Sequence, residues 1–214
     1  AITLKPNYAP AHNNCGNTLD KRGRLDDAEA SYKQAIVSNP GFAEAHNHLG
    51  VTLEKLNKLY DAEASYYEAI SLKSSYGEAY NNLGCTLEKL GKLDYAESNY
   101  RQAIALKSNY SEGHNNLGNL LRLQRKYEEA IYHFDLLNND FGTALSLECL
   151  YLCKNYVEFY RRLKTLSVLD NMNLRVAAVS SFDAHQLKIQ DPYPSCKHPL
   201  DFIEITNLAD NDFY

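Results

Sequence analysis

The eight residues Ala9-Pro-Ala-His-Asn-Asn-Cys-Gly16 open a 34-residue segment that the sequence repeats. They return as Ala43-Glu-Ala-His-Asn-His-Leu-Gly50, Gly77-Glu-Ala-Tyr-Asn-Asn-Leu-Gly84 and Ser111-Glu-Gly-His-Asn-Asn-Leu-Gly118. A unit this short cannot bury its own apolar face, so neighbouring units must stack. The period therefore predicts one continuous curved surface, and it favours binding over catalysis.

Each repeat begins with an amphipathic helix. When its slots are numbered from the first residue of each segment, apolar or small residues recur at slots 4, 7, 8 and 11, which is one face of a helix. Slot 8 is always glycine, which costs about 1 kcal/mol of helix propensity and indicates a close approach of the partner helix. The helix is expected to end near slot 15. There Gly23, Asn57 and Gly91 accept the left-handed conformation of a helix cap, whereas Arg125 breaks the pattern.

A second helix follows in each repeat. It carries alanine at slot 20 and, one turn later at slot 24, an aromatic ring: Tyr32, Tyr66, Tyr100 and Phe134. With alanine at slot 27 in three repeats and Pro40 at slot 32 of the first, the pattern resembles the tetratricopeptide repeat over residues 1–142. The resemblance implies an all-α fold, a right-handed superhelical solenoid of antiparallel helix pairs whose first helices line the concave face.

The pattern changes near both ends of the sequence. Residues 143–170 keep two amphipathic segments but lose the period, which predicts a degenerate capping helix pair, and the prolines of 191–199 predict a mostly irregular connector with a strand at 202–206. Because residues 1–8 reproduce the closing slots of a repeat, we expect a fragment of a longer array with a further C-terminal domain. The predicted segments are the remnant 1–8, the repeats 9–42, 43–76, 77–110 and 111–142, the cap 143–170 and the connector 171–214.

The composition excludes several function classes. The net charge of -5 gives no electrostatic footprint for nucleic acid. The sequence contains no apolar run of about 18 residues, so no membrane span is predicted, and the first residues do not resemble a signal peptide. Five cysteines form no disulfide framework, so a cytoplasmic location is the expectation. No motif for a cofactor is present.

Pairs of polar residues at slots 5 and 6 of the first helix are the strongest candidates for a binding site. Asparagine is a mediocre helix former, but its amide both donates to and accepts from a peptide backbone, so a ladder of amides can grip an extended peptide. The slot-6 ladder is similar to the one in protein O-linked N-acetylglucosamine transferases. The alternative is that these side chains bridge or cap adjacent helices. The predicted peptide-binding residues are Asn13, Asn14, Asn47, His48, Asn81, Asn82, Asn115 and Asn116.

Lysines at slot 13 add a second candidate set: Lys21, Lys55 and Lys89. Slots 2, 6, 9 and 13 share one helical stripe, so these lysines stand in line with glutamates at slot 2 and can hold a carboxylate of a bound peptide. The alternative is that they are solvated helix charges.

No metal site or catalytic residue is predicted. Histidines at slot 4 occupy a packing slot of the resembled family, and Cys149 and Cys153 have no second ligand pair. His133-Phe-Asp135 matches the spacing of iron oxygenases, but Phe134 occupies the packing slot of a second helix, so we interpret the match as chance.

These patterns favour an interaction module, a scaffold that binds a peptide or protein partner on the concave face and is not itself an enzyme. One alternative is the substrate-recognition arm of a larger enzyme, a glycosyltransferase, sulfotransferase or iron- and 2-oxoglutarate-dependent oxygenase, whose catalytic domain lies outside this sequence. A further alternative is self-association through an exposed end of the array.

Overall fold

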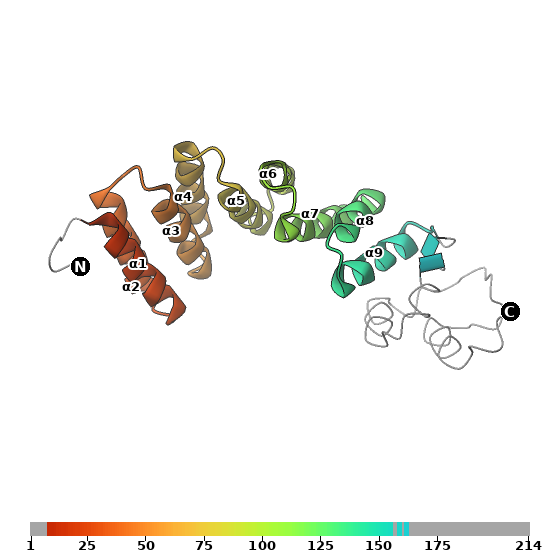
Figure 1. Ribbon diagram of the computed structural model, residues 1–214, viewed down its shortest axis with the longest axis horizontal. Helices are drawn as coiled ribbons and strands as arrows, with labels where there is room; N and C mark the ends of the chain where they lie inside the picture. Colours follow the sequence, from red (N-terminus) through yellow and green to blue (C-terminus); the bar gives the residue numbers. More distant parts are fainter. Residues whose placement is uncertain (1–7, 156–157, 160, 163–214) are drawn as a thin grey trace. The chain divides into compact units, whose positions relative to one another are not determined.

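The computed structural model describes residues 8–155, 158–159 and 161–162, and all regular structure within them is α-helical (Figure 1). The chain divides into two compact units at Gly113, and each is considered by itself. The helices are α1 (Ala9–Lys21), α2 (Leu25–Ser38), α3 (Ala43–Lys55), α4 (Leu59–Leu72), α5 (Gly77–Lys89), α6 (Leu93–Leu106), α7 (Ser111–Leu123), α8 (Tyr127–Asp135) and α9 (Asp140–Leu152).

The first unit contains three helix pairs stacked in sequence order. Within each pair the two helices pack along their length, as α1 does with α2, and α2 also packs against α3 as α4 does against α5. In addition, α1 contacts α3 and α3 contacts α5, so the first helices of successive repeats are neighbours. The predicted all-α solenoid of helix pairs is confirmed.

The glycines at slot 8 explain how closely the paired helices approach. A methyl group built on Gly84 would come within 2.6 Å of the Tyr100 ring, and one on Gly118 within 2.7 Å of the Phe134 ring. The rings at slot 24 are almost fully buried, with Tyr100 only 1% exposed. The predicted close approach is therefore confirmed, and the ring of the second helix lies directly on the glycine of the first.

Every first helix of a repeat ends in the same way. The residue at slot 15 has a positive φ, 74° at Gly23 and Gly91 and 59° at Asn57. Arg125 adopts the same conformation, with φ 62°, although its side chain disfavours it. The N–H of slot 16 donates to the C=O of slot 11 at 2.8 to 3.0 Å in all four repeats, which closes the helix end whatever residue occupies slot 15.

The second unit departs from the repeat after Phe134. Helix α8 ends at Asp135 after only 9 residues, whereas the other second helices, α2, α4 and α6, each have 14 residues. Asn138 takes a φ of 49°, and the Asn139 side chain accepts from the N–H of Gly142 at 2.8 Å, which caps the start of α9. As a result α9 begins at Asp140, inside the stretch assigned to the fourth repeat, instead of at the expected residue 143.

Several expectations lie outside the described residues: the remnant before Tyr8, most of the second capping helix, and the connector with its strand at 202–206. Among the described residues, no helix has the length and hydropathy that crossing a membrane requires.

Candidate functional site

The first helices of the first unit are linked by side chains at slots 5 and 6. Nδ1 of His48 lies 2.9 Å from Oδ1 of Asn13, and Nδ2 of Asn82 donates to Oδ1 of Asn47 at 3.2 Å. The slot-6 side chain of one repeat thus bonds to the slot-5 side chain of the repeat before it. Asn13 is 6% exposed, and Asn47 and Asn81 are fully buried. These contacts are the bridging role that the sequence left as the alternative.

The predicted amides are therefore not equally placed for a ligand. The slot-5 oxygens of Asn13 and Asn47 are engaged within the array, whereas Asn14 is exposed and His48 and Asn82 are half-buried. Asn115 and Asn116 lie on α7 in the second unit, both half-buried, and Asn115 accepts from Asn119 at 3.3 Å. Within the first unit the structure brings His48 to Asn13 and Asn82 to Asn47, and peptide binding by the whole set stays a prediction.

Two of the three predicted lysines pair with acids of the preceding repeat. Nζ of Lys55 lies 2.5 Å from Asp20, and Nζ of Lys89 lies 2.6 Å from Glu54. Thr52 donates to the same carboxylate of Asp20 at 3.2 Å, as Thr86 does to Glu54 at 2.7 Å. The two partners of each pair lie in successive repeats, 35 residues apart in the sequence. The stripe of residues on a single helix therefore did not reveal these pairs. The signal was the acid at slot 12 beside the lysine at slot 13.

The second helices are linked by a parallel set of ion pairs. Lys58 and Lys92, at slot 16, bond to Glu29 and Glu63, at slot 21 of the preceding repeat, with Nζ to Oε distances of 2.8 and 2.7 Å. Hydrogen bonds from Lys33 and then Lys58 hold the pKa of Glu29 below its usual value. Lysines at slots 13 and 16 thus each link a repeat of the first unit to the repeat before it.

A cavity of about 270 Å³ opens where α1 meets α3, and we call it the first-junction cavity. It is lined by Asn17, Asp20, Lys21, Tyr32, His48 and Val51. The rings of Tyr32 and His48 lie with centroids 5.7 Å apart, and the Tyr32 hydroxyl donates to Oδ1 of Asn17 at 2.8 Å. Burial lowers the pKa of His48, and the carboxylates of Glu78, Glu44 and Asp20 oppose that shift. The cavity therefore combines two rings and an aliphatic side chain with a polar rim.

Only Lys21 and His48 of the cavity were predicted as site residues. Asn17 and Val51 stand at slot 9, on the stripe that the sequence indicated, so spacing alone was enough to find them. Asp20 and Tyr32 were not predicted, because slot 12 lies off that stripe and Tyr32 belongs to the second helix.

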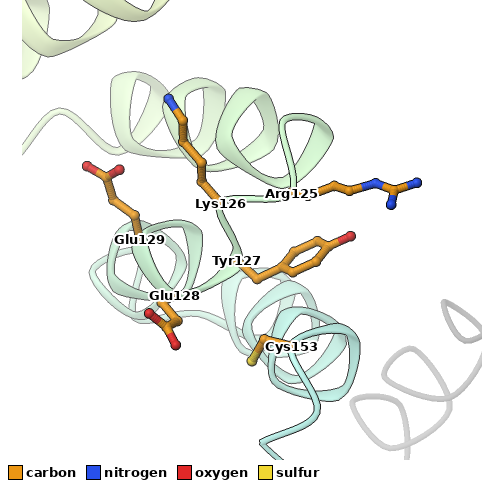
Figure 2. A pocket seen from close by; sticks show the side chains of 6 residues that line it. All are labelled: Arg125, Lys126, Tyr127, Glu128, Glu129 and Cys153. Carbon is orange, nitrogen blue, oxygen red and sulfur yellow. The ribbon is translucent and has the colours of Figure 1, made fainter.

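A second cavity, of about 380 Å³, lies in the second unit beside the turn from α7 to α8. Figure 2 shows its lining by Arg125, Lys126, Tyr127, Glu128, Glu129 and Cys153. The side chains of Arg125 and Tyr127 extend to the same side of the turn, while Lys126 extends away from them (Figure 2). Side chains of both charges mix here without a convergent set, so we assign no ligand to it. In the described part of the chain, no three His, Cys, Asp or Glu side chains group as metal ligands do.

The histidines and the oxygenase-like spacing have packing roles where the structure describes them. Nδ1 of His114 lies 2.9 Å from Nδ1 of His133, and both rings are 6% exposed. Asp135 pairs with Arg162 at 2.7 Å. His46, at the same slot as His114, is only half-buried and its Nε2 lies 3.1 Å from the C=O of Pro40. The interpretation of the His133 to Asp135 spacing as chance stays a prediction.

Comparisons with solved structures identify the fold. YrrB, described as a TPR protein with an unusual peptide-binding site, superposes with a TM-score of 0.67 at 18% identity, covering 84% of this chain and 94% of its own. PilF of Pseudomonas aeruginosa superposes with a TM-score of 0.67 at 20% identity, covering 80% of each chain. The first TPR of Spaghetti (RPAP3), bound to the HSP90 peptide SRMEEVD, has a TM-score of 0.54 at 26% identity, covering 55% of this chain and 93% of its own.

Comparisons of sequence agree with the structural ones. No curated protein matches the sequence significantly. Family models of the tetratricopeptide repeat match residues 16–76 and residues 77–110. These two stretches contain three successive repeats in which the glycine at slot 8 meets the ring at slot 24. Residues 16–110 of this chain are therefore tetratricopeptide repeats.

Proposed function

We propose that the first unit binds an extended peptide segment of a partner protein along α1, α3 and α5. The first-junction cavity is the observation that carries this proposal. Its volume of about 270 Å³ suits one large side chain, and its lining offers two rings and Val51 for contact. Pockets for single side chains beside a row of polar groups are the usual means of reading an extended peptide.

The charged residues around the cavity indicate which kind of peptide it would bind. Asp20 is neutralised by Lys55, and Lys55 and Lys89 are both held by acids of the preceding repeat. Lys21 is exposed and lines the cavity. Lys21 is therefore the slot-13 lysine best placed to meet an acidic group of the peptide, next to the large side chain in the cavity.

Two of the structural neighbours support peptides as the ligand class. One was solved with an HSP90 peptide, and another is described as having a peptide-binding site. The likeness of the slot-6 ladder to that of O-linked N-acetylglucosamine transferases stays a hypothesis. Self-association, the cytoplasmic location and the recognition arm of an enzyme likewise stay predictions, and the connector that suggested the arm lies outside the described residues.

Selection of peptides from a random display library on the full chain tests the proposal. Selected peptides are then measured by fluorescence anisotropy against a variant that fills the cavity, Val51→Trp. We expect the affinity to fall at least tenfold, while Val37→Trp, on an exposed position of α2, leaves it unchanged. Circular dichroism of both variants establishes that they are folded. Failure to select any peptide, or equal binding by Val51→Trp, would overturn the proposal.

A further inference from the structure

His48 is the one histidine at slot 6, where the other repeats have asparagine, and it lines the first-junction cavity. Its Nδ1 lies 2.9 Å from Oδ1 of Asn13. An amide oxygen can only accept a hydrogen bond, so Nδ1 of His48 carries the ring proton and donates it to Asn13. The next junction has the same direction, because Nδ2 of Asn82 donates to Oδ1 of Asn47 at 3.2 Å. The slot-6 side chain thus uses its donor inside the array.

The second ring nitrogen of His48, Nε2, is left as a hydrogen-bond acceptor. A neutral imidazole has one N–H and one bare nitrogen, and here Nδ1 holds the N–H. Burial lowers the pKa of His48, which keeps the ring neutral at neutral pH. Within the part of the chain that the structure describes, Nε2 makes no hydrogen bond and is not fully buried. The wall of the cavity therefore presents a bare ring nitrogen to an occupant.

The other polar groups of the cavity are engaged as acceptors or are donors. Both carboxylate oxygens of Asp20 already accept hydrogen bonds from side chains of α3. Oδ1 of Asn17 accepts from the Tyr32 hydroxyl, which leaves Nδ2 of Asn17 as a donor. The exposed ammonium group of Lys21 also only donates. An occupant that donates one hydrogen bond and accepts another would therefore match this lining.

We propose that His48 makes the first-junction cavity a site for a tyrosine side chain of the bound peptide, whose hydroxyl donates to Nε2. This inference rests on the proposed peptide binding and deepens it by naming the side chain that the cavity takes. The tyrosine hydroxyl can also accept from Nδ2 of Asn17, which the N–H of tryptophan cannot do. Phenylalanine has a similar ring but leaves Nε2 without a donor, and a site built to bond a hydroxyl discriminates against such an analogue. The Tyr32 ring and Val51 supply the apolar contact.

The same contact makes the cavity sensitive to acid. Protonation of Nε2 turns the acceptor into a second donor beside Nδ2 of Asn17, and the proton of the bound hydroxyl then has no acceptor. The preference for tyrosine should therefore be present at neutral pH and fall as the pH drops through the pKa of His48. The Tyr32 hydroxyl stays protonated, because burial raises its pKa to about 12. The charged and titratable groups around the His48 ring are Asp20 and Lys21 of α1, Tyr32 of α2, Glu44 of α3 and Glu78 of α5.

The test uses the full chain labelled with ¹⁵N and long-range ¹H–¹⁵N NMR, which identifies the ring nitrogen that carries the proton. The probes are N-acetyltyrosinamide and N-acetylphenylalaninamide, and the ring signals of His48 are assigned by their absence from His48→Asn. We expect a protonated Nδ1 and a bare Nε2 in the free protein, and a saturable shift of Nε2 with the tyrosine probe. Backbone amide signals give both affinities, and the tyrosine probe should bind about three- to tenfold tighter, as one hydrogen bond provides.

A series of spectra from about pH 8 to about pH 5 supplies the second half of the test, because histidine titrates in this range. The preference for the tyrosine probe should fall in step with protonation of His48. His48→Asn introduces the asparagine of the other repeats, which does not titrate, so no acid-dependent loss of preference should remain. His46→Asn removes another half-buried histidine of α3 and is the matched control, which should keep the loss.

Four results would overturn the inference: a bare Nδ1 in the free protein, an Nε2 signal that ignores the tyrosine probe, equal affinities for the two probes, or an acid-dependent loss that persists in His48→Asn. The probes need no peptide, so the two proposals can fail separately. A response of Nε2 to N-acetyltyrosinamide without any selectable peptide would refute only the proposed function. Selected peptides that bind through the cavity without a tyrosine would refute only the role of His48.

Discussion

The stacking contacts of the two units use opposite charges. Within the first unit an acid at slot 12, such as Glu54, accepts a lysine from the following repeat, Lys89. In the second unit slot 12 is Arg122, which pairs with Glu148 of α9 at 2.8 Å. The packing beneath is the same, because Gly118 lies against Phe134 as Gly84 lies against Tyr100. Packing slots therefore make the helix pair, and charges select which helix follows it.

This reversal favours α9, and disfavours the first helix of another regular repeat, as the helix that follows α8. A helix like α3 or α5, with lysine at slot 13, would bring that lysine towards Arg122, whereas α9 brings Glu148. Like charges placed together disfavour the wrong neighbour, which is how charged positions set specificity between otherwise similar surfaces. The charge at slot 12 thus favours α9 over the first helix of a regular repeat at this point of the chain.

The largest expected effect comes from breaking the packing that the two units share. Gly84→Val and Gly118→Val each place new carbons within 3 Å of a buried ring, Tyr100 or Phe134. We expect each to destabilise its own unit by about 3 kcal/mol, the upper part of the range for overpacked cores. Amide hydrogen exchange, which reports local opening free energies, measures the loss in each unit separately.

The control is Ala105→Val at an exposed position of α6, which adds a β-branched residue to a helix without a clash. Its cost should stay near the propensity difference of about 0.6 kcal/mol. If Gly84→Val cost no more than this control, the close approach of ring and glycine would not be the reason for the glycine.

The same packing explains why the fold was predictable from the sequence. Glycine at slot 8 and the ring at slot 24 touch within one repeat, so a local pattern carries the information. Arg125 was harder, because a hydrogen bond from Lys126 to Leu121 imposes its positive φ, and residue type alone does not indicate it. The end of α8 likewise depends on Asn138 and the cap at Asn139, outside the repeat pattern.

The candidate site was only partly predictable, because its contacts join different repeats. Asn47 and Asn82 were recognised as polar residues on a helix, but their mutual hydrogen bond appears only when helices are stacked. Lys55 and Lys89 were expected to face a ligand, and their pairing with acids of the preceding repeat depends on the same stacking. Sequence therefore indicates which residues are polar and repeated, and the stack decides which of them a ligand can reach.

The next prediction concerns reversal of the charge in the stacking ion pair of each unit. Arg122→Glu places a carboxylate against Glu148, whose side chain is only 12% exposed. We expect a loss of about 1–2 kcal/mol in the second unit, between the values for surface and buried pairs. Lys89→Glu in the first unit should cost under about 1 kcal/mol, because the Lys89 side chain is 55% exposed and water screens the pair.

Exchanging both partners separates charge from shape. Arg122→Glu combined with Glu148→Arg should recover most of the loss, as a double-mutant cycle read by hydrogen exchange of the second unit. A double variant no more stable than Arg122→Glu alone would mean that the polarity of this contact does not hold α9.

The smallest expected effect sharpens the comparison at slot 24. The Tyr100 hydroxyl donates to Glu88, at slot 12, at 2.9 Å, and the Tyr32 hydroxyl donates to Asn17, at slot 9. The fully buried Tyr66 hydroxyl has no partner in hydrogen-bonding geometry, because slot 9 is Val51 and Glu54 at slot 12 accepts from Thr86 and Lys89 instead. Tyr100→Phe should therefore cost about 1 kcal/mol. Tyr66→Phe should cost nothing or stabilise slightly, since it removes an unpaired polar atom and leaves the ring that the second unit already has in Phe134. Urea unfolding of both variants measures the difference, and equal losses would show that the contribution of these hydroxyls to stability does not depend on the residues at slots 9 and 12.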